Sequence, residues 1–175
     1  GEQAGGILTR FEEADLRGLE RVPGQLRMGL DFGYARAPAA YVLLLADGRN
    51  GAVYVLEGGY LYGLSNRGLA DRLKPIAGGL PVRCDSAEPK SIAELRAHGL
   101  SAVPARKGPD SVRHGLRWLA AQRIVVDSGC QQLLEELRNY RWKQDKWGMA
   151  LPVPQGEDHL IDAMRYALEP DAGGT

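Results

Sequence analysis

From residue 27 onward, short apolar runs follow one another in an order that few architectures accommodate. Three runs rich in aliphatic and β-branched residues come first, and helical and strand patterns alternate after them. The link between the second and third runs contains Asn50-Gly51, a pair typical of a tight β-hairpin turn. Because parallel neighbours need crossover connections, the order β-β-β-α-β-α-β predicts a mixed sheet with helices on its faces.

The elements of this α/β fold can be assigned residue ranges from the same patterns. We expect strands at residues 27–33, 39–48, 52–60, 81–86, 101–105 and 123–128. We expect helices at residues 65–77, 88–99, 109–122, 130–140 and 157–169. An additional β-hairpin over residues 141–154 should precede the last helix, with its turn near Asp145 to Gly148.

The two ends of the chain differ from its middle. Residues 1–26 contain several glycines and more acidic than basic residues, so we expect a linker or N-terminal extension with one short helix at roughly residues 11–20. A chain of 175 residues is long enough for one ordinary core and short for two. We therefore expect a single domain over residues 27–169 and a disordered tail over residues 170–175.

Composition excludes several classes of protein. The 22 basic residues balance the 22 acidic ones, so any nucleic-acid surface must come from local clustering of charge. Cys84 and Cys130 form no CxxC pair, which fits neither a zinc site nor a disulfide scaffold, and we expect both to be reduced and buried. No apolar run reaches the roughly 18–20 residues that span a bilayer, and the first residues lack a signal-peptide pattern. We expect a soluble, intracellular protein without a membrane partner.

Two acidic residues stand at the ends of apolar strands. Asp31 interrupts the first strand, where an ionised carboxylate is costly unless a cation or hydrogen-bond donors compensate it. Asp85 ends a short apolar strand directly before a helix, at the carboxyl edge where α/β folds build sites. A ligand role would explain both positions. Either residue could instead serve local structure, Asp31 by capping the turn that follows it and Asp85 as a helix N-cap.

A third group of ionisable residues lies on the last helix. Asp158, His159 and Asp162 are spaced so that all three can share one helical face. Like charges at this spacing destabilise a helix slightly, so a compensating cation is a reasonable inference. Alternatively, Glu157 and Asp158 only favour the positive end of the helix dipole, a role that leaves Asp162 unexplained.

Carboxylates delivered by two strands and one helix could converge on hard cations. All-oxygen sites suit Mg²⁺ or Mn²⁺, whereas Zn²⁺ prefers more His or Cys than this set offers. Two such ions would activate water and stabilise the leaving 3′-oxygen of a phosphodiester. The residues therefore indicate metal-dependent phosphodiester hydrolysis, with Glu57 and Asp127 as weaker alternative ligands.

Six segments, taken together, resemble the C-terminal nuclease domain of phage large terminases, which is RNase H-like. They are GLDFGYARAPAA, CDSAEPKSIAELRAHGL, PARKGPDSVRHGLRWL, RIVVDSGC, LRNYRWKQDKWG and EDHLIDAMRYAL. They occur in the order of that family and cover nearly everything from Arg27 to Leu168. A strand-borne DFG alone is weak, but DSAEPKSI followed by ARKGPDS and DHxxDAxRYAL is specific. The resemblance implies an RNase H-like fold and cleavage of concatemeric double-stranded viral DNA.

The resemblance also assigns roles to individual residues. It places the family's metal-binding acids on Asp31, Asp85 and Asp162. The family's histidine falls on His159, whereas Asp158 corresponds less closely. The implied cofactors are two divalent cations, Mg²⁺ or Mn²⁺.

Large terminases combine such a nuclease with a packaging ATPase. This chain contains no GxxxxGK[ST] phosphate loop, so the ATPase must reside elsewhere. The resemblance therefore implies a cutting domain that works beside an ATPase domain, a small terminase subunit and a portal protein. We expect the isolated domain to be monomeric and to act in the host bacterial cytoplasm.

Basic residues gather in the second half of the chain. The predicted DNA-binding residues are Lys90, Arg106, Lys107, Arg141, Lys143 and Lys146. The loop pair at 106 and 107 is followed by a glycine that gives a phosphate access to the backbone. The hairpin cations alternate with Trp142 and Trp147, as in a flap that touches DNA, although a solvated hairpin over a packed tryptophan has the same pattern. Such contacts give little base specificity and strong salt dependence.

Two other functions fit parts of the pattern. A Holliday-junction resolvase or transposase-like enzyme of the same fold would share the acids but gives no reason for the DSAEPKSI and ARKGPDS segments. A non-catalytic docking module for portal and small terminase would be expected to lack one acid, and all three are present. We therefore predict a metal-dependent DNA endonuclease.

Overall fold

The computed structural model describes residues 5–18, 22–33, 37–106, 108 and 110–173. Its strands are β1 (Phe11–Ala14), β2 (Gln25–Asp31), β3 (Ala39–Asp47), β4 (Ala52–Leu61), β5 (Val82–Cys84), β6 (Ala102–Pro104), β7 (Arg123–Asp127), β8 (Arg141–Gln144) and β9 (Ala150–Gln155). Its helices are α1 (Asn66–Ala77), α2 (Pro89–Ala97), α3 (Ser111–Ala120), α4 (Gln131–Asn139) and α5 (His159–Ala167). From β2 onward, this order confirms the elements that the sequence predicts.

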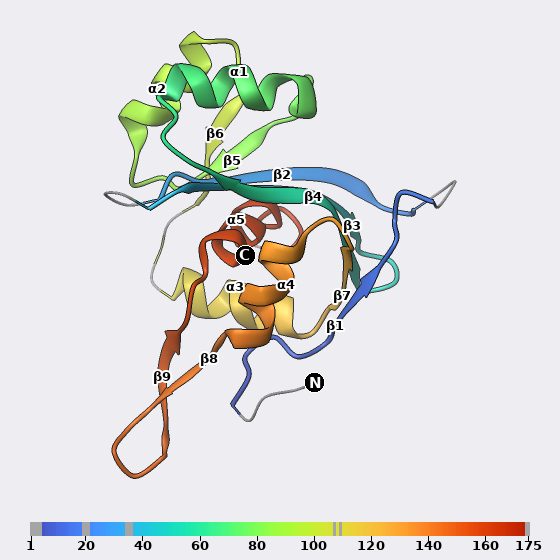
Figure 1. Ribbon diagram of the computed structural model, residues 1–175, viewed down its shortest axis with the longest axis vertical. Coiled ribbons are helices and arrows are strands. Elements are labelled where there is room, and N and C mark those ends of the chain that lie inside the picture. Colours follow the sequence, from blue (N-terminus) through green and yellow to red (C-terminus); the bar gives the residue numbers. More distant parts are fainter. Residues whose placement is uncertain (1–4, 19–21, 34–36, 107, 109, 174–175) are drawn as a thin grey trace.

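Within the described ranges, the strands form a seven-stranded mixed sheet and a separate hairpin. The order in the sheet is β1-β7-β4-β3-β2-β5-β6. The three central strands β2, β3 and β4 are antiparallel, and the remaining pairs are parallel. Strands β8 and β9 pair with each other and extend away from the body of the molecule (Figure 1), and the first residue of β8, Arg141, also bridges Gly6 of the N-terminal segment. The mixed sheet flanked by helices and the additional hairpin are therefore both confirmed.

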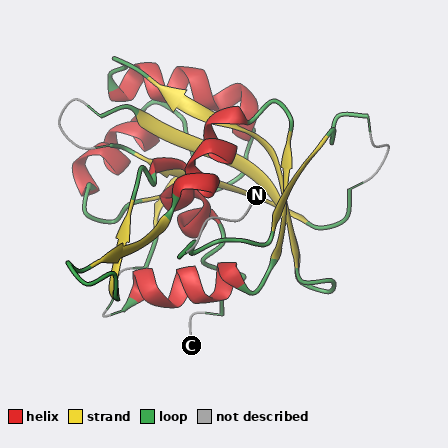
Figure 2. Ribbon diagram, turned by 60° about the horizontal axis from the view of Figure 1, so that its bottom comes forward, coloured by secondary structure: helices red, strands yellow, loops and turns green. Residues whose placement is uncertain are grey.

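Helices cover both faces of the sheet. Helices α1 and α2 lie on one face, and α3, α4 and α5 lie on the other (Figure 1). Leu69 and Leu73 of α1, four residues apart as a buried helical face requires, pack in one core cluster with Leu30 of β2. A second cluster joins the opposite side of the sheet to Leu133 of α4 and Met164 of α5. Figure 2 shows the strands of the sheet twisted relative to one another, as is usual for β-sheets.

Helix α5 lies unusually close to β2. A Cβ atom on Gly29 would stand 2.0 Å from the carbonyl oxygen of Ala163 and 2.9 Å from the backbone nitrogen of Ala167. Only a residue without a side chain fits there, because backbone atoms on the helix cannot turn aside as a flexible side chain can. The glycine in β2 and the alanines of α5 therefore bring Asp162 toward the strand that ends in Asp31.

The N-terminal segment differs from the sequence prediction. The helix expected at roughly residues 11–20 is wrong, because Phe11–Ala14 form β1 and pair in parallel with β7 at the edge of the sheet. Leu8 and Leu16, on either side of β1, are buried. Local acidic residues favour a helix only weakly, and the hydrogen bonds offered by the open edge of β7 outweigh that preference. Residues 19–21, at the end of the expected helix, lie outside the described residues.

The C-terminal segment is also more ordered than expected up to residue 173. Residues 170–173, which we assigned to a disordered tail, form turns. Arg27 Nε donates to Asp171 Oδ2 at 2.9 Å and so ties this segment to β2. Residues 174–175 lie outside the described part of the chain. The division into residues 1–26, 27–169 and 170–175 as linker, domain and tail stays a prediction.

Both cysteines are free and buried, as the sequence predicts. They lie on opposite faces of the sheet, because Cys84 belongs to the cluster under α1 and α2 whereas Cys130 belongs to the cluster under α3, α4 and α5. In the described ranges, no helix is long and apolar enough to cross a membrane.

Candidate functional site

The two strand-borne acids end neighbouring parallel strands. Strands β2 and β5 pair in parallel with Leu30 opposite Cys84. Asp31 and Asp85 are the next residues along these strands. Because the carboxyl ends of parallel neighbours meet at the same edge of a sheet, the structure brings these two predicted site residues to one edge.

Each of these acids also accepts a hydrogen bond from the turn that follows it. Asp31 Oδ1 accepts from the backbone N–H of Gly33 at 3.1 Å, and Asp85 Oδ1 accepts from that of Ala87 at 3.0 Å. The turn-capping alternative for Asp31 is therefore part of the structure. The N-cap alternative for Asp85 is wrong, because the N-cap of α2 is Glu88. Each carboxylate uses one oxygen in its turn, which leaves the other for a further partner.

The acidic group on the last helix meets the acid of β2. His159 begins α5, and its Nδ1 lies 3.4 Å from Asp31 Oδ2. Its other ring nitrogen lies 3.2 Å from Glu157 Oε2. One turn further along α5, Asp162 Oδ1 accepts a hydrogen bond from Arg165 Nη2 at 2.8 Å. Asp158 is the N-cap residue of α5 but makes no side-chain capping bond.

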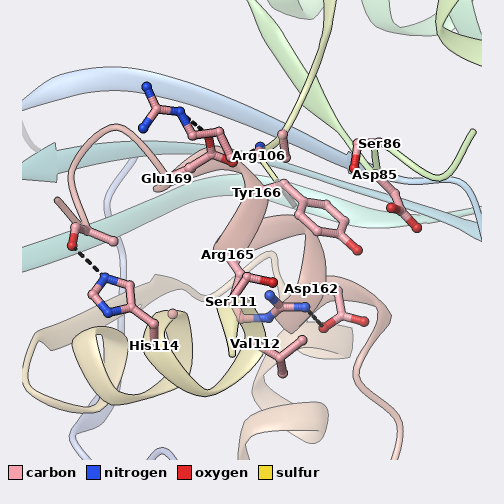
Figure 3. A pocket seen from close by; sticks show the side chains of 13 residues that line it. Asp85, Ser86, Arg106, Ser111, Val112, His114, Asp162, Arg165, Tyr166 and Glu169 are labelled. Carbon is pink, nitrogen blue, oxygen red and sulfur yellow. Dashed lines mark hydrogen bonds and ion pairs between the residues drawn. The ribbon is translucent and has the colours of Figure 1, made fainter. Parts of the chain in front are cut away.

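A cavity of about 400 Å³ opens between the strand ends, α3 and α5. Asp85 and Asp162 both line it, and Figure 3 shows their carboxylates beside the ring of Tyr166. Its polar and charged lining also includes Ser86, Arg106, Ser111, His114, Arg165 and Glu169. The cavity therefore joins two of the predicted acids to a set of cationic and hydroxyl groups from other elements.

The acids share one electrostatic environment. The pKa of Asp162 is raised to about 6, by burial first and also by the charges of Asp158 and Asp31, against the opposing effect of Arg165. The pKa of Asp158 is also raised, by burial and then by Asp31, with His159 opposing. Ionised carboxylates held this close together repel one another, and a positive charge between them would relieve that repulsion.

Tyr166 reports on the same environment from α5. Its pKa is raised by burial first and then by the charges of Asp162, Asp85 and Asp31. All three predicted metal ligands therefore lie near enough to one tyrosine to disfavour its ionised form. This common influence connects Asp31, which does not line the cavity, with the two acids that do.

The pKa of His159 is raised. Burial opposes a charge on the imidazole, but the carboxylates of Asp31, Glu136 and Glu157 together outweigh that effect. The histidine is thus held between acids in a position that favours its protonated form more than water would.

The acids do not form a closed cage. In the described part of the chain, no three His, Cys, Asp or Glu side chains stand close enough together to hold one metal ion as they are. Asp31 is engaged with His159, and Asp162 is engaged with Arg165. The predicted ligands therefore lie in one region, and Asp85 and Asp162 line the same cavity, but Asp31 and Asp162 contact separate partners.

Sequence reasoning missed the residue that holds the start of α5. Glu136 of α4 is 3% exposed, and its carboxylate accepts from the backbone N–H groups of Leu160 and Ile161 at 3.0 Å. The Tyr60 hydroxyl also donates to Glu136, and the Tyr60 ring stands edge-on to His159 with centroids 6.2 Å apart. A signal was available, because Glu136 falls on the apolar stripe of α4 between Leu133 and Leu137.

The predicted DNA-binding residues fall in three places. Lys90 is exposed in the first turn of α2. Arg106 lines the cavity, and its backbone N–H donates to the Glu169 carboxylate. Lys107 lies outside the described residues.

The third place is the hairpin. Arg141 and Lys143 lie on β8, and Lys146 Nζ stands 4.6 Å from the centroid of the Trp147 ring. Trp142 packs against the core cluster below α3, whereas Trp147 is 76% exposed. The packed Trp142 fits a solvated hairpin over a tryptophan, and the exposed Trp147 fits a flap that touches DNA, so the structure has features of both interpretations.

The two weaker ligand candidates lie elsewhere. Glu57 is exposed on β4. Asp127 is buried at the end of β7, where it accepts from the backbone N–H groups of Leu16 and Gly129, both at 2.9 Å. Neither lines the cavity, and Asp127 has a structural task because it ties the segment after β1 to β7.

Comparisons with known proteins identify the family and the fold of the chain. The family model described as "Terminase RNAseH like domain" matches residues 31–170. The large terminase subunit of Bacillus phage SPP1 is 38% identical over 172 residues, which are 95% of this chain and 39% of that protein. The SPP1 nuclease domain solved with bound Mn has a TM-score of 0.84 at 32% identity, over 95% of this chain and 99% of that one. The predicted resemblance and the RNase H-like fold are thus confirmed.

A further solved structure shows how far the fold extends. The large terminase nuclease of the thermophilic phage G20c, with bound magnesium, has a TM-score of 0.60 at 21% identity over 84% of this chain and 82% of that one. At that identity the likeness concerns the fold alone. The chain spans about two fifths of the length of its SPP1 relative, since 39% of that protein is covered.

Proposed function

Because the chain belongs to the family of terminase RNase H-like domains, we propose that it is the metal-dependent endonuclease of a phage large terminase. In this proposal it cuts concatemeric double-stranded viral DNA with little sequence preference. The observation that carries the proposal is that Asp85 and Asp162, from β5 and α5, line one cavity, while Asp31 of β2 contacts His159 at the start of the same helix. Carboxylates that lie near one another repel when they are ionised, so this arrangement favours the binding of a cation that compensates them.

The donors fit a divalent cation in kind. Asp31, Asp85 and Asp162 offer only carboxylate oxygens, the ligands that Mg²⁺ and Mn²⁺ prefer, and Asp158 is a further candidate. The raised pKa of Asp162, due chiefly to burial, indicates that its ionised form lacks sufficient compensation from the protein. Two divalent cations held by these acids would supply a nucleophile near neutral pH and neutralise charge on the leaving oxygen. Bound Mn in the SPP1 nuclease domain and bound magnesium in the G20c nuclease support this choice of cations.

Other residues of the chain would prepare the substrate. His159, held by Asp31 and Glu157, would keep a proton on its ring and place a positive charge beside the acids. Glu136 fixes the first turn of α5 and thereby the position of His159 and Asp162. Lys90, Arg106, Lys107 and the hairpin cations would contact phosphates, which fixes the duplex without reading its bases.

The setting of this reaction follows from the family. We propose that the chain acts beside a terminase ATPase domain, the small terminase subunit and the portal protein, in the cytoplasm of a bacterial host. Large terminase subunits such as that of SPP1 are longer than this chain, and the packaging activity would belong to the remainder. We further propose that the isolated domain is monomeric.

A plasmid-cleavage assay tests the proposal. Supercoiled DNA would be incubated with Mn²⁺ or Mg²⁺ and the wild-type chain, Asp31→Asn or Asp162→Asn. Losing one ligand should slow nicking and linearisation by about a hundredfold or more, since cations contribute several kcal/mol to such reactions. Asp71→Asn is the matched control, because Asp71 is an exposed residue of α1 that pairs with Lys74 in its own helix.

Calorimetric titration with Mn²⁺ completes the test. The wild-type chain should bind Mn²⁺, and both site variants should bind it more weakly. Cleavage that persists in EDTA or in either site variant would refute the metal-dependent mechanism. A wild-type chain that neither binds Mn²⁺ nor cuts DNA would favour the docking-module alternative instead.

A further inference from the structure

A buried arginine stands among the acids of the site. The Arg165 side chain is 9% exposed and lines the cavity between α3 and α5. Its Nη2 donates to Asp162 Oδ1 at 2.8 Å, the contact marked by the dashed line in Figure 3. Its Nε is buried and has no hydrogen-bond partner among the described residues. The guanidinium is therefore charged and buried, but only partly satisfied.

The fold makes room for this side chain. Gly115 lies inside α3, where a Cβ atom would stand 3.2 Å from Arg165 Cδ and 3.6 Å from Cγ. Glycine destabilises a helix interior relative to alanine, so its presence there has a purpose, and the aliphatic stem of Arg165 supplies one. The guanidinium also lies over the Tyr166 ring, with Cζ 5.4 Å from the centroid.

The partner of Arg165 is one of the proposed metal ligands. A divalent cation and the guanidinium would compete for the same carboxylate, because Arg165 occupies an Asp162 oxygen. While Arg165 is bound to Asp162, its buried Nε has no partner among the described residues, and an unpaired buried donor costs free energy. A cation that bound Asp162 would therefore release the guanidinium of Arg165, which would gain free energy by binding another acceptor.

The cavity offers a place for such an acceptor. Arg106, His114 and Ser111 line the same cavity of about 400 Å³ as Arg165. His114 Nε2 lies 3.1 Å from the Ala172 carbonyl oxygen and Arg106 Nε lies 4.0 Å from Glu169 Oε1, so Arg165 and Ser111 are the donors nearest to being available. Donors of this kind suit a phosphate, and a guanidinium is especially suited because it can form two parallel hydrogen bonds to phosphate oxygens. The cavity also borders Asp85 and Asp162, where the proposed cleavage would occur.

We propose that Arg165 is a phosphate-binding residue of the nuclease site. While the site lacks divalent cations, Asp162 holds its guanidinium; when a cation binds Asp162, the guanidinium is released to a backbone phosphate of the DNA. Arg165 thus acts as an internal counter-ion for the acids before it becomes a contact to the substrate. This inference rests on the proposed function, because it needs both the cation and the DNA.

The first experiment measures Mn²⁺ affinity without DNA, by calorimetry at pH 8.5, where the carboxylates are ionised. Arg165→Met keeps most of the volume of the side chain and removes the competing charge. It should bind Mn²⁺ at least about threefold more tightly than the wild type, since a neighbouring positive charge is lost. Gly115→Ala, which keeps Arg165 but crowds its stem, should shift the affinity in the same direction. Arg27→Met is the matched control, because Arg27 also pairs with a carboxylate but lies outside the cavity.

The second experiment measures the binding of a short DNA duplex in Ca²⁺, by fluorescence anisotropy over a range of salt concentrations. Arg165→Met should bind DNA about tenfold more weakly and lower the slope of affinity against salt by about one phosphate contact. Arg165→Lys keeps the charge without the planar fork, so it should retain part of the affinity and most of the slope. If the role of Arg165 were purely structural, Arg165→Met would not raise the Mn²⁺ affinity and would not change the salt slope.

The outcomes separate the inference from the proposed function. Arg165→Met with unchanged or weaker Mn²⁺ binding, or with an unchanged salt slope, overturns the inference even if the wild type cuts DNA. A wild type that neither binds Mn²⁺ nor cuts DNA overturns the proposed function, and the inference with it. Circular dichroism identifies variants that fail to fold. If Arg165→Met does not fold, Gly115→Ala replaces it in the measurement of Mn²⁺ affinity and Arg165→Lys replaces it in the measurement of DNA binding.

Discussion

Both faces of the central sheet bury apolar clusters, but the two faces differ in the charged side chains that lie beside those clusters. Under α1 and α2, the core cluster contains only apolar side chains and one cysteine. Under α3, α4 and α5, the apolar cluster lies beside the buried Glu136 and the partly satisfied Arg165. The charges of α1 stay in water, as in the pair of Asp71 and Lys74.

This difference separates stability from chemistry. The α1–α2 face needs only good packing, which apolar residues supply at no cost in buried charge. The α3–α5 face must hold ionised groups at fixed places, and each such group costs free energy unless it is hydrogen-bonded. We infer that the first face stabilises the domain and that the second face uses part of that stability to build the site.

The largest effect should come from closing the space between β2 and α5. Gly29→Ala would place a Cβ atom 2.0 Å from the Ala163 carbonyl oxygen, so α5 must move and Asp162 with it. We expect the free energy of unfolding to fall by more than about 4 kcal/mol and cleavage to be lost, as measured by urea denaturation and the plasmid assay. Gly79→Ala, with no atom within 4 Å of the new Cβ, is the control. A Gly29→Ala chain as stable as Gly79→Ala would contradict the close approach of α5.

The α1–α2 face should lose stability without losing chemistry. Leu73 is fully buried in α1, and Leu73→Ala should lower the free energy of unfolding by about 3 kcal/mol through the cavity it leaves. The cleavage rate per folded molecule should not change, because no residue of this cluster lines the cavity of the site. Leu64→Ala, at an exposed position, serves as the control. If Leu73→Ala slows the folded enzyme, the two faces are not separate in function.

On the opposite face, Glu136→Ala should affect both properties. Removing the carboxylate leaves the N–H groups of Leu160 and Ile161 without their acceptor, which should lower the free energy of unfolding by about 2 kcal/mol. Cleavage should also be slower, because the first turn of α5 is no longer held in place. Glu136→Gln keeps an acceptor oxygen and should restore most of both. Urea denaturation and the plasmid assay on the two variants distinguish a lost hydrogen-bond acceptor from a lost charge.

The pH dependence of stability in the wild type and in Glu136→Gln tests whether the charge of Glu136 costs stability. Burial raises the pKa of Glu136, against the opposing hydrogen bonds from Tyr60, Leu160 and Ile161. The ionised form therefore penalises the folded state above the raised pKa, whereas below the ordinary pKa of about 4.3 the group is neutral in both states and the penalty is absent. The stability of Glu136→Gln relative to the wild type should rise as the pH increases from the ordinary pKa of a glutamate through the raised pKa of Glu136. A relative stability that falls over this range would show that the charge stabilises the fold.

The smallest effect concerns the two thiols, which report on each face separately. Burial raises the pKa of Cys84 to about 12 and that of Cys130 to about 11, so both should react with a disulfide reagent only when the fold opens. In single-cysteine variants at pH 8, Cys84 should react more slowly than Cys130, because the α1–α2 face buries fewer charges and should open less often; absorbance follows the reaction. Faster reaction at Cys84 would mean that the α1–α2 face opens first, and it would contradict the inference that this face stabilises the domain.

The sequence predicts most of the fold because most of its signals are local. The runs that form β2, β3 and β4 and the stripes of α1 and α4 carry their periodicity within themselves. The strand-end acids were also visible, since a charge at the end of an apolar run is conspicuous without any partner.

The features that sequence reasoning missed depend on distant residues. β1 is a strand only because β7 pairs with it, and Asp127 holds the following Leu16 across 111 residues of sequence. Arg165 reads as an ordinary exposed arginine of the last helix until Gly115 of α3 is seen beneath its stem. Non-local pairing of this kind leaves no period in the sequence, so patterns alone do not reveal it.

The two glycines beneath α5 and Arg165 also bear on how the site could be moved to another protein. A designer who grafted only the three aspartates would bring over the charges without the spacing that makes them neighbours. Gly29 sets the depth at which the last helix lies on the sheet, and Gly115 sets the depth at which the arginine lies between helices. The smallest transferable version of this site therefore includes two residues with no side chain at all.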